Sequence, residues 1–186
     1  MPRNFHNDHK QSQREQLSPW WQALYKKAFP NFHSMEVVTD LALQKTGIDR
    51  IITLDDGHTI TIEEKVRYSV YPDILLEYRS TPTATGWINK PLHCDYIAYV
   101  FEPNKTAHIL PYQLLRRAWL ENNKAWLKQY KHVPGRNQGY TSMSVAIPIR
   151  VLKQALYDAS LISFASGLDL WYNIANKTLL SCRISP

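Results

Sequence analysis

Two acidic residues and a lysine on neighbouring extended segments are the part of this sequence best suited to chemistry. Glu63, Glu64 and Lys65 lie in a segment that alternates between apolar and polar residues, and Asp49 opens the extended segment before it. Side chains alternate between the two faces of a strand, so Glu63 and Lys65 share one face and Glu64 takes the other. Pairing of the two segments across the turn at 55–58 would bring Asp49 close to Glu63 and Lys65. Two carboxylates and an ammonium group at one place suit a divalent metal ion and an activated water.

The elements around these residues are predicted to be a helix and a hairpin. Residues 49–54 and 58–67 are rich in Ile and Thr, and the turn between them contains the Asp-Gly pair favoured in hairpins. The apolar spacing over 34–45, with Ser34 as N-cap, predicts a helix just before the hairpin. Glu36 would then lie in that helix.

The rest of the chain predicts an α/β fold in which helices flank a mixed β-sheet. The hairpin strands and a third strand are expected to be antiparallel neighbours, and the remaining strands to extend the same sheet. The expected strands after the hairpin are 73–79, 95–102, 106–110 and 140–147; the other expected helices are 19–29, 112–130 and 148–159; the expected loops are 80–92 and 132–139.

Length and composition indicate a single domain. The chain has 186 residues, of which 17–186 are predicted to form one domain and the polar stretch 1–16 to be disordered. No apolar run approaches the roughly 20 residues of a membrane span, so no membrane partner is expected. Cys94 and Cys182 form no close pair, which favours free thiols in a cytoplasmic setting.

The charge is distributed unevenly along the chain. Residues 32–110 contain seven Lys or Arg against eleven Asp or Glu, whereas residues 111–186 contain ten against three. An acidic middle followed by a basic segment suits a protein that holds a cation and binds a polyanion around it.

The arrangement of these residues resembles the PD-(D/E)xK nuclease superfamily, including its phage and prophage members. The residues that carry the resemblance are Ile48-Asp49, Glu63-Glu64-Lys65 and the helix and strand that follow them, within residues 34–157. The resemblance implies a restriction-endonuclease-like core and hydrolysis of phosphodiester bonds, with DNA as the expected substrate and Mg²⁺ or Mn²⁺ as the cofactor. Ile48 stands where the motif name has proline.

The resemblance also implies roles for individual residues. Asp49 and Glu63 match the metal-binding acids, and Lys65 matches the lysine that orients or deprotonates the attacking water. Glu36 matches an acid that many members place beside the metal, and Glu64 would contribute its main-chain carbonyl. A lysine next to a metal ion is expected to have a lowered pKa, which would let it share the proton of the water.

Basic residues outside this motif are candidates for contacts with the nucleic acid. The helix 112–130 and the loop after it, together with two strands near the acids, provide them: Arg67, Arg79, Arg116, Arg117, Lys124, Lys128, Lys131 and Arg136. Branched and single-stranded DNA are included among the expected substrates. A homodimer in a bacterial or phage-infected cell is expected from the resemblance, with the apolar C-terminal segment as a candidate contact.

Three alternatives stay open at the level of the sequence. The Glu63–Lys65 pair is also what a solvated strand face with an ordinary ion pair would contain, and the basic residues suit a solvated helix face. The chain could be a nucleic-acid-binding module that keeps the fold without catalysis. It could also be a phage structural or interaction protein, for which its many Trp and Tyr residues would serve assembly.

Overall fold

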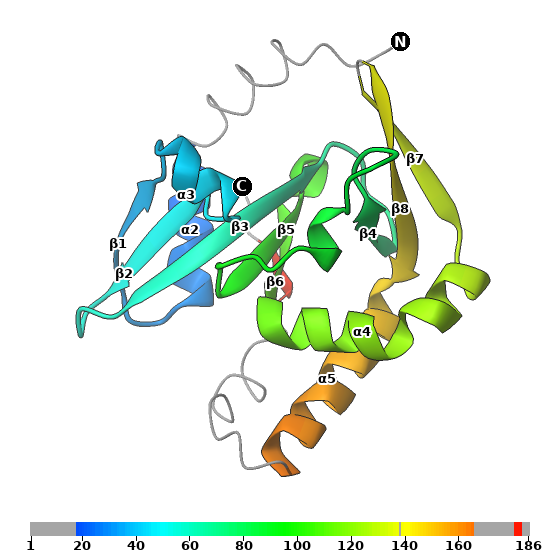
Figure 1. Cartoon of the computed structure of the whole chain (residues 1–186). Helices are drawn as coiled ribbons and strands as arrows, with labels where there is room; N and C mark the ends of the chain where they lie inside the picture. The colour runs from blue at the N-terminus through cyan, green and yellow to red at the C-terminus, as the bar shows by residue number, and fades with distance from the viewer. Residues whose placement is uncertain (1–17, 138, 166–180, 184–186) are drawn as a thin grey trace.

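The computed structural model describes residues 18–137, 139–165 and 181–183 (Figure 1). The stretch 1–16 that the sequence predicts to be disordered lies outside these residues. Most of the C-terminal segment considered for a dimer contact lies outside them as well.

The first described helix, α2 (Pro19–Ala28), begins as the sequence predicts. The Ser18 hydroxyl accepts a hydrogen bond from the Trp20 N–H at 3.4 Å, and proline occupies the first helical turn, where its missing N–H costs nothing. Its apolar stripe is buried and includes Leu24 and Tyr25. The stripe fixes which side of α2 faces the sheet.

The main sheet has six strands in the order β1-β2-β3-β5-β6-β9. β3 and β5 run parallel, and every other neighbouring pair is antiparallel. The strands are β1 (Phe32–Val37), β2 (Arg50–Leu54), β3 (Thr59–Arg67), β5 (Tyr96–Phe101), β6 (Thr106–Pro111) and β9 (Ser181–Arg183). The expected hairpin is therefore confirmed as β2–β3, and the sheet is mixed, as predicted.

The helix expected over 34–45 is wrong for its first half. Residues 32–37 form β1, which pairs with β2 from Phe32↔Leu54 to Val37↔Arg50. Only α3 (Leu41–Lys45) is helical, and it begins where Asp40 Oδ1 accepts the Ala42 N–H at 2.6 Å. The open edge of β2 offered backbone partners to this segment, and they outweighed a weak helical pattern.

A second, three-stranded sheet has the order β4-β8-β7, which corrects two further expectations. β4 (Asp73–Arg79) was expected beside the hairpin, but it pairs with β8 (Tyr140–Pro148) instead. The stretch expected to be a loop at 132–139 contains β7 (His132–Asn137), the other partner of β8. β3 has β2 on one side and β5 on the other, so β4 finds its partner elsewhere.

The remaining helices are η1 (Trp87–Asn89), η2 (Glu102–Asn104), α4 (Tyr112–Gln129) and α5 (Ile149–Ala165). They lie between strands, and η2 joins two neighbours of the main sheet, β5 and β6. The helix expected at 112–130 is confirmed, and α5 continues beyond the expected end at 159. In the described part of the chain, no helix is both long and apolar enough to cross a membrane.

Two hydrophobic cores lie on opposite faces of the main sheet. One face carries Ile52, Ile62 and Ala98 and packs against α2. The other carries Ile97 and Tyr99 and packs against α4, α5, η1 and the second sheet. In Figure 1, α2 lies behind β2 and β3, whereas the loop that contains η1 passes in front. The main sheet is thus a central layer flanked by helices.

Candidate active site

Asp49 lies directly before β2, where two hydrogen bonds fix it against β3. Its main-chain N–H donates to the Ile62 carbonyl at 2.8 Å, and its Oδ2 accepts the Glu64 main-chain N–H at 2.8 Å. Burial, followed by the nearby charge of Glu63, raises the pKa of Asp49 to about 7. The Glu64 N–H and Lys65 act in the opposite direction, and they are too weak to cancel these two effects. The Asp49 carboxyl group is therefore fixed in position, partly shielded from solvent and close to a second acid.

Glu63 and Lys65 lie on the same face of β3, as the alternation predicts. Glu63 is only 8% exposed, and its Oε1 forms an ion pair with the Lys65 ammonium group. The Lys65 Nζ also lies 5.8 Å from the centre of the Trp87 ring. The register places Glu63 beside Ile97 of β5, on the face opposite α2. Asp49 interacts electrostatically with both Glu63 and Lys65, so the three side chains lie near one another.

Without a metal ion beside it, Lys65 has a pKa that is raised rather than lowered. Burial alone would lower the pKa of Lys65, but its ion pair with Glu63 raises it above the ordinary value. Asp49 and Glu77 of β4 add to that increase. Lys65 is consequently a charged ammonium group at neutral pH, suited to stabilising negative charge rather than to accepting a proton.

The side chain of Glu64 lies on the opposite face of β3, as expected. It packs under α2, where it accepts hydrogen bonds from Tyr25 and Arg50. The N–H and C=O of one strand residue point to the same side, so the Glu64 carbonyl is directed toward the side of Asp49, beyond the start of β2. This placement fits the expectation that Glu64 contributes its carbonyl and not its carboxylate.

Glu36 does not occupy the helix in which it was expected. It lies on β1, is exposed, and pairs across the strands with Ile51. Directly opposed residues share a face, so Glu36 is on the same face as Glu63, but it lies two strands away from β3. Its side chain is thus at the outer edge of the site face.

The donor set fits a hard divalent cation. It consists of two carboxylates, Asp49 and Glu63, and the main-chain carbonyl of Glu64. Oxygen ligands of this kind, completed by water, suit Mg²⁺ or Mn²⁺. Within residues 18–137, 139–165 and 181–183, no three His, Cys, Asp or Glu side chains gather closely enough to hold a metal ion by themselves. Burial, followed by the nearby charge of Glu63, raises the pKa of Asp49, and a cation bound beside the two acids would offset their mutual repulsion.

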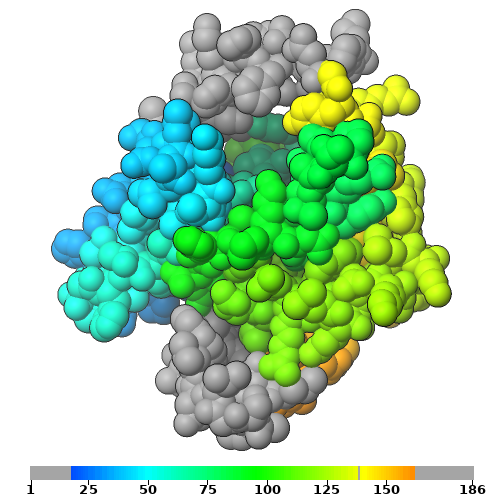
Figure 2. Space-filling view, in the orientation of Figure 1, coloured from blue at the N-terminus to red at the C-terminus, as the bar shows by residue number. Residues whose placement is uncertain are grey.

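The site is bordered by the segment that links β3 to β5. Trp87 is 8% exposed and packs within the hydrophobic core. Burial, followed by the charge of Glu63, raises the pKa of the Cys94 thiol to about 12, which keeps that thiol unreactive. Figure 2 shows the surface hollowed between the atoms of α3 and those of the loop 80–92, on the side of the sheet opposite α2.

Sequence reasoning missed Arg50 and Tyr25 as neighbours of the site. Arg50 is fully buried, and the only signal was its position next to Asp49 in an otherwise apolar strand. Tyr25 belongs to the apolar stripe of α2 and gave no polar signal.

The two strand arginines that are candidates for contacts with the nucleic acid have different surroundings. Arg67 Nη1 forms an ion pair with Asp73 Oδ1 at 2.8 Å, and its guanidinium lies 4.1 Å from the centre of the Tyr71 ring. Arg79 is exposed at the end of β4. Arg67 is thus engaged in holding the connection between β3 and β4.

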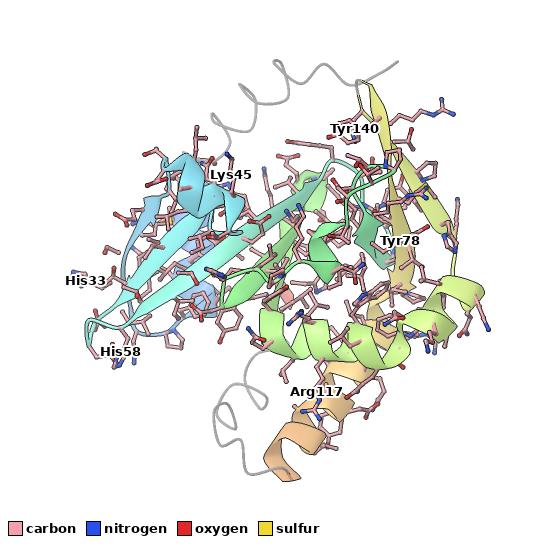
Figure 3. The ribbon with its side chains drawn as sticks, in the orientation of Figure 1. His33, Lys45, His58, Tyr78, Arg117 and Tyr140 are labelled. Atoms are coloured by element: carbon pink, nitrogen blue, oxygen red, sulfur yellow. The ribbon has the colours of Figure 1, made fainter. Side chains whose placement is uncertain are left out.

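The expected basic residues of α4 and its continuation lie on the surface at a distance from the acids. Arg116 and Arg117 are partly exposed, and Arg117 Nε pairs with Glu121 at 3.1 Å. In Figure 3, Arg117 lies beside α5, on the side of α4 away from β3. The other members of the set are exposed: Lys124 and Lys128 on α4, Lys131 just after it, and Arg136 on β7.

In the absence of metal, Asp49 is expected to make the protein less stable as the pH rises. Its pKa is about 7 when folded and 3.8 when exposed, so the folded state binds the proton more tightly. Its stabilising contribution is complete below pH 3.8 and is lost as the pH rises through 7. A pKa difference of one corresponds to about 1.4 kcal/mol, which limits the loss to roughly 4 kcal/mol.

Urea unfolding of wild-type protein and Asp49→Asn at several pH values between 4 and 8 checks this prediction. The unfolding free energy of the variant should gain on that of the wild type as the pH rises. His108, whose burial lowers its pKa to about 4, acts in the opposite sense, and comparing the two proteins removes its effect. A difference between the proteins that stays constant with pH would contradict the raised pKa of Asp49.

No protein-family model, curated protein or solved structure matches this chain.

Proposed function

We propose that the protein is a metal-dependent nuclease with a restriction-endonuclease-like core, similar to the PD-(D/E)xK superfamily. The observation that carries the proposal is the convergence of Asp49, Glu63 and Lys65 at one edge of the β2–β3 pairing. A central mixed sheet flanked by helices agrees with the core that the resemblance implies. DNA is the proposed substrate, with branched and single-stranded forms included.

The residues of the site would divide the chemistry among them. Asp49, Glu63 and the Glu64 carbonyl would hold Mg²⁺ or Mn²⁺. A divalent ion bound there would polarise the phosphate and lower the pKa of a bound water. Lys65, as a charged ammonium group, would orient that water and offset the negative charge that develops on the phosphate oxygens. Its contact with Glu63 would have to open for a cation to bind, so Lys65 would turn toward the substrate.

The proposed nucleic-acid contacts lie in a part of the chain that contains no acid. Between Glu121 and Asp158 the sequence has no Asp or Glu, yet it contains Lys124, Lys128 and Arg136. In Figure 1 this stretch runs from α4 through β7 and β8, whose hairpin extends away from the main sheet. Such a surface suits contact with a phosphate backbone, which attracts cations without reading sequence.

The double variant Lys124→Gln/Lys128→Gln is expected to weaken DNA binding and its dependence on salt. Each lost phosphate contact lowers the slope of log K against log salt by about 0.9, so the slope should fall by about 2. Fluorescence anisotropy with duplex DNA at 50 to 200 mM NaCl measures this. Lys26→Gln on α2, an exposed lysine on the other side of the sheet, is the matched control. An unchanged slope in the double variant would move the contact surface elsewhere.

A cleavage assay tests the proposed function. Plasmid, linear and branched DNA are incubated with wild-type protein, Glu63→Ala or Lys65→Ala, with Mg²⁺, Mn²⁺ or a chelator. The proposal expects cleavage by the wild type that needs the metal ion and is lost in both variants. Absence of cleavage with every substrate would contradict it. Cleavage that persists in Glu63→Ala would show a contaminating or different activity.

A non-catalytic nucleic-acid-binding module is the second candidate. The observation that favours it is the ion pair between Glu63 and Lys65, because the ammonium group already neutralises the carboxylate that a metal would need. DNA binding that is unchanged in Glu63→Ala, with no cleavage by the wild type, would select this candidate. Wild-type protein that neither binds nor cleaves DNA would instead favour a structural or interaction protein of a phage.

The proposal includes a cellular setting and an oligomeric state. The buried free thiol of Cys94 agrees with a cytoplasmic location, in a bacterial or a phage-infected cell. A homodimer would let two sites cut the two strands of a duplex. Sedimentation at increasing protein concentration measures the oligomeric state.

A further inference from the structure

Three polar side chains lie directly behind the candidate site, on the α2 face of β3. Glu64 Oε1 accepts the Tyr25 hydroxyl at 2.7 Å and the Arg50 Nε at 2.6 Å. Arg50 Nη2 donates to Glu64 Oε2 at 3.2 Å. The side chains of Arg50 and Glu64 are 0% and 4% exposed. We refer to these three residues as the Tyr25–Glu64–Arg50 cluster.

The cluster is tied to the site through the main chain of both strands. Arg50 follows Asp49, and Glu64 follows Glu63, so each strand sends one residue to the site and the next to the cluster. The Glu64 main-chain N–H also donates to Asp49 Oδ2 at 2.8 Å. A movement of the Glu64 peptide would therefore displace the Asp49 carboxylate on the other face of the sheet.

The surroundings of Arg50 hold the cluster in one geometry. Its guanidinium lies 5.1 Å from the centre of the Trp21 ring and 5.7 Å from that of Tyr25. Arg50 Nη1 also contacts Met35 Sδ at 3.7 Å. These contacts come from α2 and β1, and together with Glu64 on β3 they hold the Arg50 guanidinium in place.

Stability alone does not explain why the charged Arg50–Glu64 pair is buried in this core. The neighbouring side chains of this core are apolar, including Ile52, Ile62 and Ala98. Well-packed apolar residues of similar volume are often as stabilising as a buried ion pair, or more so. The pair instead restricts geometry. Hydrogen bonds to the Glu64 carboxylate limit the orientation of that residue, and therefore of its main chain, more strictly than apolar packing does.

We propose that the Tyr25–Glu64–Arg50 cluster positions the Asp49 carboxylate for metal binding by holding the main chain of Glu64 from behind the sheet. Its members are positioning residues, since they lie on the face of β3 opposite the site. The link to metal binding depends on the proposed function, whereas the hold on the Asp49–Glu64 hydrogen bond does not.

Amide hydrogen exchange in metal-free protein tests the structural half of this proposal. In Tyr25→Phe, the amide of Glu64 is expected to exchange about tenfold faster, whereas amides of the β5–β6 pairing keep their wild-type rates. Tyr96→Phe is the matched control, because it removes the same hydroxyl from a tyrosine in the same core. Equal exchange of the Glu64 amide in wild type and Tyr25→Phe would overturn the proposal.

The double variant Arg50→Met/Glu64→Leu separates positioning from stability. It should fold with a midpoint of thermal unfolding close to that of the wild type, yet the amide at position 64 should lose protection. Its affinity for Mn²⁺, measured by calorimetry, should fall about 10-fold or more, as is usual when groups that orient metal ligands are removed. A folded double variant with wild-type protection and Mn²⁺ affinity would show that the cluster is only structural.

Separate results test the link to metal binding and the hold on the Asp49–Glu64 hydrogen bond. Wild-type protein that does not bind Mn²⁺ would contradict the proposed function and the link of the cluster to metal binding. The exchange rate of the Glu64 amide would still decide whether the cluster holds the Asp49–Glu64 hydrogen bond.

Discussion

Methionine in place of Lys65 is expected to lower the kcat of metal-dependent DNA cleavage by about 10²–10⁴-fold. The Lys65 ammonium group pairs with Glu63 and acts on the charge of Asp49, on the site face of the sheet, so it is well placed to offset charge on the phosphate. The same change should tighten Mn²⁺ binding, because the Glu63 carboxylate loses its competing partner. Turnover and metal affinity would then move in opposite directions, which general damage to the fold would not produce.

Lys105→Met provides the control for that result. Lys105 also pairs with a nearby glutamate, Glu102, but in the η2 turn, outside the site. Single-turnover cleavage and Mn²⁺ titration should give wild-type values for Lys105→Met. Lys65→Met that cleaves at the wild-type rate would contradict the role assigned to Lys65.

Arg50→Met is expected to destabilise the fold by about 3–5 kcal/mol. Arg50 is fully buried and supplies two of the three side-chain hydrogen bonds that the Glu64 carboxylate receives in the described structure. Without it, a carboxylate remains in an apolar core with one hydroxyl partner, and the unpaired charge is much more costly than the lost contact. The unfolding free energy from urea titration at pH 7 measures the effect.

Two comparisons make the result specific. The double variant Arg50→Met/Glu64→Leu should recover most of the lost stability, because it removes both charges together. Arg117→Met, which removes a partly exposed ion pair with Glu121, should cost less than about 1 kcal/mol. A loss below 1 kcal/mol in Arg50→Met itself would contradict the view that the pair is buried and tightly coupled.

The sequence could predict one part of the site, namely which side chains share a face of β3, because side chains alternate along a strand. The period of two fixed Glu63 and Lys65 on one face and Glu64 on the other, and the structure has that arrangement. The Asp-Gly turn fixed the pairing that brings Asp49 next to β3. These features depend on local geometry, so the residues of the hairpin alone are enough to predict them.

Features that depend on distant partners could not be predicted in the same way. The segment 32–37 has apolar residues that fit a helix and a strand alike, and pairing with β2 decided between them. β4 pairs with β8, which begins more than 60 residues later in the chain, and not with the hairpin. Glu63 and Asp49 raise the pKa of Lys65, and Glu77 on that second sheet adds to the increase. Local sequence patterns do not reveal which distant segments of the chain will pair or pack together.

We propose above that Asp49 and Glu63 share one divalent metal ion. Crystals of the wild-type protein soaked in Mn²⁺, with diffraction recorded at the manganese absorption edge, test it directly. The proposed site predicts an anomalous peak within coordination distance of both carboxylates and of the Glu64 carbonyl, with Lys65 turned away from Glu63. No peak at saturating Mn²⁺, with Lys65 still paired to Glu63, would contradict the claim.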